Sequence, residues 1–408
     1  MSRRSCRFCA SPLHWVVADL GMSPFANSYV TQEQLGSMEP FYPLCALVCE
    51  NCFLVQLEEY ESPSHIFTDY AYFSSFSSSW LSHCDQYALR MIEERDLDSS
   101  SCVVEIASND GYLLQSFVQR GVPVLGIEPA VNVAQAAQTK GVSTITEFFG
   151  EKIASELSDE YRADLLIGNN VLAHVPDLND FVEGMHRLLK SDGLITMEFP
   201  HLLRLLEDRI FDTIYHEHVS YFSFSTARKV FERHGLDIFD VEELPTHGGS
   251  LRIHATHSAG SPGLTPRARR LLRKEVEHGL GNIDRYLSFG NEVKREKRAI
   301  LRSLISWKED GLTIAGYGAP AKGNTLLNYC GVGTDVLDFT VDRNPYKQGR
   351  YLPGSHIPIR AVESLHEHRP DLVLILPWNL RTELMSELTF VHEWGGRLAA
   401  RTPELVII

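Results

Sequence analysis

The centre of the chain, from residue 100 to 257, alternates short apolar runs with stretches of helical periodicity. The apolar runs have the length of strands and read VVEIA, VPVLGIE, STITEFF, ADLLIGNN and GLITMEFP. Between them, apolar residues recur three and four positions apart, which predicts amphipathic helices. This alternation predicts a doubly wound parallel sheet. Two further runs, LDIFDVEEL and GSLRIHATH, follow each other without a helix, so they predict an antiparallel pair.

The regions on either side have patterns of their own. Residues 311–408 again give strand, glycine turn and helix, beginning with LTIAGYGAPAKGNTLLNY, and predict a second α/β unit. Residues 262–310 are dense in charge and predict one or two solvated helices that link the two units. A chain of 408 residues is long enough for two or three domains. We expect them at residues 1–65, 66–258 and 259–408.

The charge balance restricts the partners. The formal net charge is −15, so we expect no basic surface for a nucleic-acid polymer. No apolar run approaches the length of a membrane-spanning helix, and the basic N-terminus lacks the apolar region of a secretory signal. We therefore expect a cytoplasmic protein with no membrane partner. Its eight cysteines then favour free thiols and metal ligands over disulfides.

Four of these cysteines form two C-x-x-C pairs near the N-terminus. Cys6 and Cys9 open the first 60 residues, and Cys49 and Cys52 close them after an intervening 39 residues. Two such pairs can give four thiolates to one tetrahedral zinc ion, with each pair forming a knuckle. Four thiolates close the coordination shell, so the sequence predicts a structural zinc rather than a catalytic one. A redox pair or unligated thiols are the alternatives.

The stretch VVEIASNDGYLL, residues 103–114, predicts a strand, a tight turn and the start of a helix. Glu128 ends the next strand 23 residues after Glu105, where a Rossmann-like domain places an acid against a ribose. S-adenosylmethionine enzymes of this type carry a pattern close to E-x-G-x-G-x-G. Here Ala107 and Asn109 stand at two of the glycine positions and only Gly111 remains. The residues expected to bind the cofactor are Glu105, Ala107, Asn109, Gly111, Tyr112, Leu113, Glu128, Pro129, Asn169 and Asn170.

Three polar segments follow the predicted strands and carry candidate chemistry. They are GNNVLAHVPD with His174, FPH with His201, and DTIYHEHVSYFS. The last one groups Tyr215, His216, Glu217 and His218; in an extended segment the two histidines would share one face and the glutamate would point away. This is not the helical i, i+4 spacing of zinc ligands, so we favour general acid–base work by histidine near neutral pH. Histidines satisfied in the core or at the surface are the alternative.

Two more stretches could contact a ligand. Residues 66–82 alternate aromatic residues with serines, which fits a lid over a polyhydroxylated ligand or a linker anchored on the next domain. In the second α/β unit the glycines of GYGAPAKGN depart from the dinucleotide fingerprint, but they could cradle a pyrophosphate beside Lys322. Asp342 could then meet a ribose, and Lys347 and Arg350 could reach phosphate. A scaffold unit with no ligand is the alternative.

Together these motifs resemble the S-adenosylmethionine-dependent C-methyltransferases of deoxysugar biosynthesis. The resemblance covers nearly the whole chain, and YHEH together with the double C-x-x-C is its specific combination. It implies a zinc-binding N-terminal domain, a Rossmann-like class I methyltransferase domain and a second Rossmann-like domain. It also implies a dTDP-linked 4-keto-6-deoxysugar as substrate, as for the 3-C-methyltransferases of antibiotic sugars. A base then removes the proton beside the C4 ketone, and the resulting enolate carbon takes the methyl group.

The same resemblance implies roles for individual residues. His218 would be the base, Tyr215 and His174 would stabilise charge on oxygen, and Glu217 would orient a histidine. A tyrosine of the aromatic stretch, most plausibly Tyr72, would line the same pocket. The residues expected at the substrate are Tyr70, Tyr72, His201, His216, His247, Gly248, Lys322 and Asn324. We expect a monomer.

Other functions stay open at this point. An O- or N-methyltransferase would look much the same in its first half, and the residue spacing does not separate it from a C-methyltransferase. A nicotinamide-dependent oxidoreductase would use the C-terminal glycine turn, but it would leave the YHEH segment without a purpose. A zinc-ribbon binding protein is a third possibility. The sequence also leaves open whether C3 or C5 is methylated, since both flank a C4 ketone.

Overall fold

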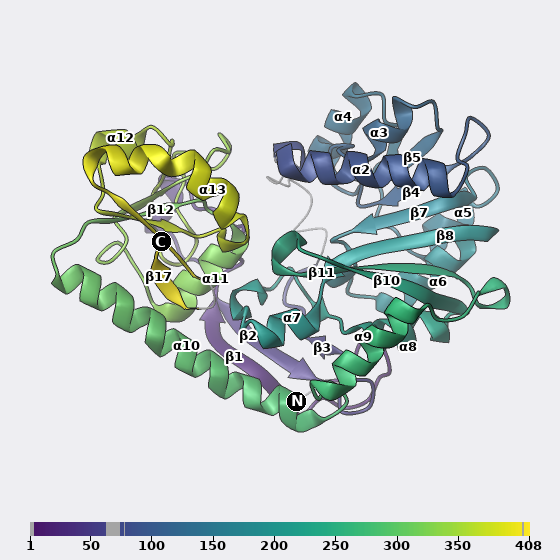
Figure 1. The fold of residues 1–408 in the computed structure, drawn as a ribbon, viewed down its shortest axis with the longest axis horizontal. Helices are drawn as coiled ribbons and strands as arrows, with labels where there is room; N and C mark the ends of the chain where they lie inside the picture. The colour runs from purple at the N-terminus through teal and green to yellow at the C-terminus, as the bar shows by residue number, and fades with distance from the viewer. Residues whose placement is uncertain (1–3, 63–73, 77, 402–403) are drawn as a thin grey trace.

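The computed structural model describes residues 4–62, 74–76, 78–401 and 404–408. The chain forms two lobes joined along one side by an N-terminal sheet and a long helix (Figure 1). The central lobe contains a seven-stranded sheet in the order β10-β11-β8-β7-β4-β5-β6. Its strands are β4 (Val103–Ile106), β5 (Val124–Ile127), β6 (Thr144–Ile145), β7 (Ala163–Asn169), β8 (Leu189–Pro200), β10 (Leu236–Leu244) and β11 (Ser250–His257).

The central sheet confirms the doubly wound pattern predicted from the sequence. The strands β4 to β8 are parallel, whereas β11 runs antiparallel to β8 and β10 runs antiparallel to β11. The run STITEFF contributes only the two residues of β6, because the rest of it turns away into a loop. The helices of this lobe are α2 (Ser78–Glu94), α3 (Leu114–Val118), α4 (Val131–Thr139), α5 (Glu151–Leu157), α6 (Leu178–Leu188), α7 (Leu202–Glu207) and α8 (Phe224–Arg233).

The C-terminal lobe is built on a six-stranded sheet in the order β14-β13-β12-β15-β16-β17. All neighbours in it are parallel except β16 and β17. Its strands are β12 (Ile314–Tyr317), β13 (Phe339–Val341), β14 (Ile359–Arg360), β15 (Leu372–Ile375), β16 (Arg397–Arg401) and β17 (Leu405–Ile407). Its helices are α11 (Ala321–Cys330), α12 (Ser364–His368) and α13 (Arg381–Glu387).

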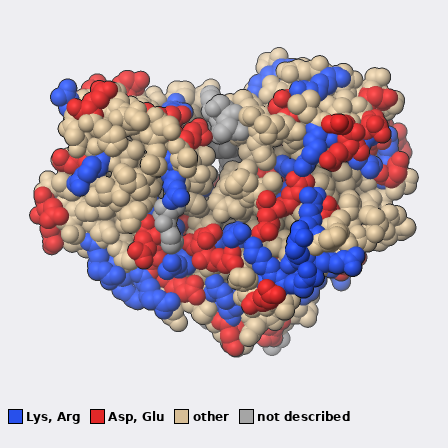
Figure 2. Space-filling view, in the orientation of Figure 1, with Lys and Arg blue, Asp and Glu red and all other residues tan. Residues whose placement is uncertain are grey.

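Two helices connect the lobes, as their charge-dense sequence predicted. They are α9 (Pro266–Glu277) and the 27-residue α10 (Ile283–Glu309), which runs from the bottom of the molecule along the underside of the C-terminal lobe (Figure 1). The buried stripe of α10 includes Tyr286, Phe289 and Ile300, and part of this helix packs on β1. Its outer face carries lysine and arginine side chains, which gather along the lower edge of the molecule (Figure 2). Only the outer face is therefore solvated.

The N-terminal sheet includes a strand from the central lobe. Its order is β1-β2-β3-β9, where β1 is Trp15–Ser23, β2 is Tyr42–Val48, β3 is Val55–Gln56 and β9 is Ser220–Tyr221. The strand β9 comes two residues after His218, so the candidate catalytic segment leads directly into this sheet. The same sheet region reaches the C-terminal lobe through a bridge between Val30 and Tyr351. The N-terminal region thus contacts both lobes, and the predicted domain boundaries stay predictions.

Candidate active site and zinc centre

The turn after β4 takes an unusual backbone path. Ala107, Asn109 and Gly111 have φ angles of 56°, 50° and 73°, which are left-handed values. These are the three positions at which the E-x-G-x-G-x-G pattern would have glycine. Gly111 is also closely packed, because a Cβ there would lie 2.9 Å from Val142 Cγ2. The turn therefore keeps the shape of the glycine-rich loop with a small residue and an asparagine in place of two glycines.

Two buried acids lie at the ends of the first two strands of this sheet. Glu128 joins the turn to β5, since its carboxylate accepts hydrogen bonds from the backbone N–H groups of Asn109 and Ala130, both at 2.9 Å. Neither carboxylate oxygen of Glu105 has a hydrogen-bond partner among the described residues. Burial raises the pKa of both acids, that of Glu105 most strongly. Buried polar atoms without partners are rare, and here they fit a ligand that brings donors of its own.

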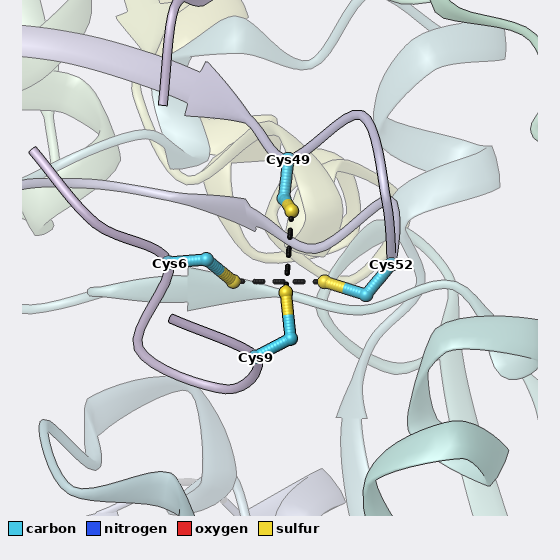
Figure 3. Close-up of side chains that lie close together, drawn as sticks. All are labelled: Cys6, Cys9, Cys49 and Cys52. Atoms are coloured by element: carbon cyan, nitrogen blue, oxygen red, sulfur yellow. Dashed lines mark hydrogen bonds between the residues drawn. The ribbon is translucent and has the colours of Figure 1, made fainter. Parts of the chain in front are cut away.

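The four cysteines of the two C-x-x-C pairs converge at one point (Figure 3). Their sulfur atoms all lie within 4.8 Å of one another, with Cys6 and Cys52 at 3.6 Å and Cys9 and Cys49 at 3.5 Å. Each pair forms a knuckle, in which the first cysteine's carbonyl accepts the backbone N–H of the residue after the second cysteine. Those two residues, Ala10 and Phe53, both have left-handed backbones. This arrangement fits a tetrahedral zinc ion with a closed shell of four thiolates.

The zinc site is connected to the candidate catalytic segment by hydrogen bonds. The Cys49–Cys52 knuckle leads into β3, which pairs with β9. The pairing continues where the N–H of Leu57 donates to the carbonyl of Val219 at 3.0 Å, one residue from His218. In addition, the hydroxyl of Thr226 donates to the carbonyl of Cys52 at 3.1 Å. Zinc binding therefore supports the backbone that carries the candidate catalytic residues.

Tyr215 and His218 form a hydrogen-bonded pair. The hydroxyl of Tyr215 lies 2.7 Å from Nε2 of His218, and Nδ1 of His218 lies 3.2 Å from the carbonyl oxygen of Thr213. A carbonyl can only accept, so Nδ1 carries the proton and Nε2 accepts from Tyr215. Burial holds the pKa of His218 well below its usual range, and nearby His174 acts in the same direction. His218 is therefore a neutral imidazole whose tautomer is fixed by the Thr213 carbonyl.

His174 packs its ring against that of His218, with the ring centres 4.7 Å apart. It follows β7 in a short 3-10 turn, Leu172–His174, and its Nδ1 donates to the carbonyl of Glu217 at 2.7 Å. Burial lowers its pKa to about 4, so it is neutral. Its remaining nitrogen, Nε2, carries a lone pair and accepts hydrogen bonds. The expected role of His174 in stabilising charge on oxygen stays a prediction.

The segment around Glu217 is a turn, not the extended stretch expected from the sequence. The N–H of His218 donates to the carbonyl of Tyr215 at 2.9 Å, which separates the side chains of His216 and His218. His216 packs against Phe25, among the aromatic rings of the N-terminal sheet, and its Nε2 donates to the carbonyl of Pro43 at 3.2 Å. The expectation that the two histidines share a face was therefore wrong, and His216 has a packing role.

Glu217 points toward the N-terminal region. Its Oε2 accepts a hydrogen bond from Nδ2 of Asn27 at 2.5 Å, and the side chain is only 3% exposed. Burial raises the pKa of Glu217 to about 7. Asn27 in turn interacts with Tyr29, whose hydroxyl donates to the carbonyl of Ala319 at 2.6 Å. Glu217 therefore lies where the central lobe, the N-terminal region and the C-terminal lobe meet.

A second group of side chains comes from between the lobes, where the surface is hollowed (Figure 2). His247 has a left-handed backbone, and its Nε2 accepts a hydrogen bond from Nδ2 of Asn170 at 3.1 Å. Lys322 of α11 donates to Oδ1 of Asn379 at 2.7 Å and lies over the ring of Trp378 at 5.0 Å. Burial lowers the pKa of Lys322 to about 8. Burial lowers the pKa values of His218 and His247, and the charge of Lys322 lowers both further.

Two residues expected at the substrate have other contacts. His201 lies in a buried pair with Glu275 of α9, at 2.8 Å, and its side chain is 1% exposed. Asn324 donates to the carbonyl of Ala26 at 2.6 Å and joins the C-terminal lobe to the N-terminal region. Each side chain thus has a protein partner for one of its polar atoms, while Nδ1 of His201 and Oδ1 of Asn324 have none among the described residues, so their expected role at the substrate stays a prediction. Gly248 packs against Trp378 at the site, and the calls on Tyr70 and Tyr72 lie outside the described residues.

Asp342 of the C-terminal lobe has a role like that of Glu128. Its carboxylate accepts from the backbone N–H groups of Ala319 and Asn344 at 2.7 and 2.8 Å, and it lies 3.6 Å from Nζ of Lys347. Lys347 also donates to the carbonyl of Ala319. The two lobes therefore share one feature. Glu128 follows β5 and accepts a hydrogen bond from the turn after β4, and Asp342 follows β13 and accepts one from the turn after β12.

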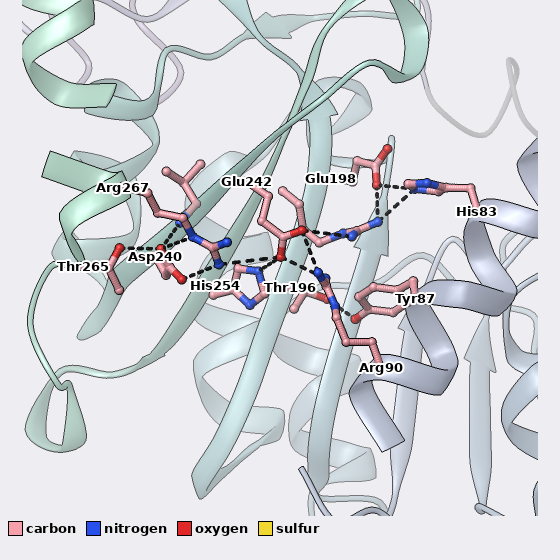
Figure 4. A network of polar contacts seen from close by, with 12 residues as sticks. His83, Tyr87, Arg90, Thr196, Glu198, Asp240, Glu242, His254, Thr265 and Arg267 are labelled. Atoms are coloured by element: carbon pink, nitrogen blue, oxygen red, sulfur yellow. Dashed lines mark hydrogen bonds and ion pairs between the residues drawn. The ribbon is translucent and has the colours of Figure 1, made fainter. Parts of the chain in front are cut away.

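A buried polar network at the end of β8 was not expected from the sequence (Figure 4). Glu198 is fully buried and accepts hydrogen bonds from Arg252 at 2.7 Å and from the hydroxyl of Thr246 at 2.7 Å, while His83 of α2 lies 3.1 Å away. Arg252 approaches Glu242 to 3.6 Å. This network fixes the turn Thr246–Gly248, which presents His247. The signal in the sequence was an acid in GLITMEFP paired across the sheet with an arginine in GSLRIHATH.

Comparison with known proteins agrees with this architecture. Three family models match in order: a putative zinc binding domain at residues 6–67, a methyltransferase domain at 82–241 and a C-methyltransferase C-terminal domain at 245–403. C-methyltransferase NovU of Streptomyces niveus is 35% identical over 407 residues, which cover 99% of this chain and 96% of that protein. The chain belongs to this C-methyltransferase family. It is an S-adenosylmethionine-dependent C-methyltransferase with a four-cysteine zinc-binding site.

Matches that cover less of the chain are also found. The ubiquinone biosynthesis O-methyltransferase of Rhodopseudomonas palustris strain TIE-1 is 27% identical over 110 residues, covering 26% of this chain and 44% of that protein. The structure of magnesium protoporphyrin IX methyltransferase from Synechocystis PCC 6803 with bound SAH is 17% identical. It covers 44% of this chain and 83% of that chain with a TM-score of 0.36. None of the described helices is long and apolar enough to cross a membrane.

Proposed function

We propose that this C-methyltransferase acts on a dTDP-linked 4-keto-deoxysugar and methylates the carbon beside the ketone, at C3. The observation that carries the proposal is the hydrogen-bonded pair of the half-buried Tyr215 and the buried, neutral His218, whose tautomer is held by the carbonyl of Thr213. Methylation of carbon beside a ketone needs a base for a C–H proton and a site that tolerates negative charge on oxygen. The full-length similarity to a C-methyltransferase supports carbon as the acceptor.

Four residues have roles in the proposed mechanism. Tyr215 takes the proton from C3 as its own hydroxyl proton passes to Nε2 of His218, 2.7 Å away. His218 becomes an imidazolium and later releases that proton to solvent. Lys322, a half-buried lysine whose charge acts on His218, favours the negative charge that develops on the ketone oxygen. His174 packs its ring against that of His218 and would line the same pocket.

The turn of residues 107–111, Glu105, Glu128 and Asn170 would hold S-adenosylmethionine, in agreement with their backbone path and unsatisfied polar atoms. When bound, this cofactor supplies an electrophilic methyl group. Four thiolates saturate the zinc ion, so its role is structural. His247 and Lys322 lie between the lobes, where the nucleotide sugar would enter.

The decisive experiment is a product assay. The protein is mixed with carbon-13-methyl S-adenosylmethionine and a dTDP-4-keto-6-deoxyhexose, preferably 2-deoxygenated, and the product is read by NMR. A methyl group on C3 is the expected result, whereas a methyl group on oxygen or nitrogen would overturn the enolate chemistry. A methyl group on C5 would keep that chemistry and correct the position.

A second assay tests the base separately. In D2O with S-adenosylhomocysteine, which carries no transferable methyl group, the enzyme should exchange the C3 proton of the ketosugar for deuterium. Tyr215→Phe should abolish this exchange, and the control Tyr161→Phe, a tyrosine beyond the site, should leave it unchanged. Exchange at the wild-type rate in Tyr215→Phe would remove Tyr215 from the mechanism.

A further inference from the structure

A buried carboxylate fastens the catalytic segment to the C-terminal lobe. Asp212 is fully buried and lies three residues before Tyr215, in the 3-10 turn η4 (Phe211–Thr213). Its Oδ2 accepts a hydrogen bond from the indole Nε1 of Trp378 at 2.6 Å, and its Oδ1 accepts one from Nη1 of Arg401 at 3.0 Å. A buried carboxylate needs such donors, because without them its desolvation is costly.

Both donors lie at the carboxyl ends of two neighbouring strands of the C-terminal sheet. Trp378 begins the 3-10 turn η7 (Trp378–Leu380), just after β15, and Arg401 ends β16, the neighbouring strand. Arg401 is itself held on several sides. Its guanidinium covers the ring of Phe211 at 4.8 Å, donates to the carbonyl of Arg209, and approaches Glu296 to 3.4 Å. The backbone from residue 209 to 212 is thereby fixed to this lobe.

The residue that follows Asp212, Thr213, contacts His218 directly. The carbonyl of Thr213, next to Asp212, accepts the Nδ1 proton of His218. If Asp212 moves, that carbonyl moves too, and the proton of the neutral imidazole is then free to occupy Nε2 instead. On Nε2 it would compete with the hydroxyl of Tyr215 and remove the lone pair that the base needs.

Trp378 also contacts the rest of the site. Its ring lies so close to Gly248 that a Cβ there would be 2.4 Å from Cη2, and Lys322 lies above the same ring. Trp378 thus contacts Asp212 in the turn before Tyr215, Gly248 in the turn that presents His247, and the side chain of Lys322. A group with these three contacts can set the geometry of the site without touching the reacting atoms.

We propose that Trp378 and Arg401 are positioning residues, which hold Asp212 so that His218 keeps its proton on Nδ1 and its lone pair toward Tyr215. The inference about the tautomer depends only on these contacts. Its consequence for methyl transfer rests on the proposed function. The C-terminal lobe thereby takes part in the chemistry through the catalytic segment, in addition to any role in binding.

The test uses Trp378→Phe in the full-length, zinc-loaded protein. This variant keeps an aromatic ring but removes the indole N–H that reaches Asp212. The matched control is Trp394→Phe in the same lobe, which removes an indole N–H that donates to the carbonyl of Pro370 at 3.0 Å, outside the site. Asp212→Asn serves as a second variant, since its NH2 group replaces one of the two accepting oxygens and would face a donor.

The first readout is nitrogen-15 NMR of histidine-labelled protein, with the His218 signals assigned by their loss in His218→Gln. Wild type and Trp394→Phe should show the Nδ1–H tautomer, and both test variants should show a substantial Nε2–H population. The second readout is turnover on the ketosugar. We expect a loss of at least about tenfold in kcat, since a misplaced catalytic group costs up to about 100-fold, and an S-adenosylmethionine Kd within about twofold of wild type.

An unchanged His218 tautomer in both test variants would overturn the proposal. So would turnover equal to that of Trp394→Phe despite a changed tautomer. If the wild-type protein methylates no ketosugar, the proposed function fails, but the NMR comparison still decides whether Asp212 and its two partners fix the tautomer of His218.

Discussion

Replacement of Glu217 by glutamine should change how stability depends on pH. In the folded protein burial raises the pKa of Glu217 to about 7, from 4.5. The folded state therefore holds the Glu217 proton more tightly than the unfolded state, and the free energy of unfolding falls as the pH rises through this interval. Between pH 5.5 and 7 the loss is 1.5 pH units at 1.36 kcal/mol each, or about 2 kcal/mol. Above the folded-state pKa of about 7, Glu217 is ionised in both the folded and the unfolded state, so its effect on the free energy of unfolding no longer changes with pH.

Glu217→Gln removes this penalty, because an amide stays neutral at every pH. The stability of wild type relative to Glu217→Gln should therefore drop by about 2 kcal/mol from pH 5.5 to pH 8. His174, His216 and His218 are present in both proteins, so their own titrations cancel in the difference. The exposed Glu156, with 59% of its side chain accessible, supplies a control: Glu156→Gln should shift stability equally at both pH values.

Two measurements check this reasoning. Thermal unfolding of the three zinc-loaded proteins across the pH range gives the difference in stability. Carbon-13 NMR of glutamate-labelled wild type, minus the spectrum of Glu217→Gln, should show one carboxyl signal that titrates near pH 7. A carboxyl signal that has already titrated by pH 5, or a difference in stability that is the same at pH 5.5 and pH 8, would refute the burial argument.

Three further outcomes test other parts of the site. Tyr215→Phe and His218→Gln should each lower kcat by about 100-fold or more, in the range of general acid–base catalysis, with calorimetric S-adenosylmethionine binding retained; wild-type kcat in either would contradict the assignment. Cys9→Ser should lose the single zinc ion measured by mass spectrometry and lower both thermal stability and turnover; full turnover without zinc would show that the catalytic segment does not depend on the N-terminal sheet. Gly111→Ala should weaken S-adenosylmethionine binding, because its Cβ would clash, whereas Gly121→Ala has a similar φ of 76° in open space and should cost only about 1 kcal/mol of stability; equal affinities would contradict the close packing of the turn.

Local signals in the sequence predicted part of the site correctly. The spacing of Cys6, Cys9, Cys49 and Cys52 was enough to predict the four-cysteine centre, because each pair forms its knuckle from neighbouring residues. The small residues after Glu105 predicted the turn, since its left-handed backbone depends on local sterics. The parallel sheet and its closing antiparallel pair also followed from the alternation of apolar runs.

For other candidate residues the sequence carried no sign of partners that are distant along the chain. His201 was expected to contact a ligand at the end of a strand. Its imidazole forms a buried pair with Glu275, which lies 74 residues later in the sequence. His216 looked like a partner of His218, but the turn at Glu217 rotates it into the aromatic rings of the N-terminal sheet. Nothing near either histidine in the sequence indicates these contacts.

The sequence alone therefore determined the zinc ligands, the shape of the cofactor turn and the identity of the candidate catalytic segment. Only the tertiary structure decided how that segment is used. The tautomer of His218 depends on one carbonyl, and that carbonyl is held through Asp212 by Trp378 and Arg401, which follow Asp212 by 166 and 189 residues. The physical reason is that a periodic pattern records which face of an element is buried, whereas hydrogen-bond partners in a buried site are set by the packing of separate elements.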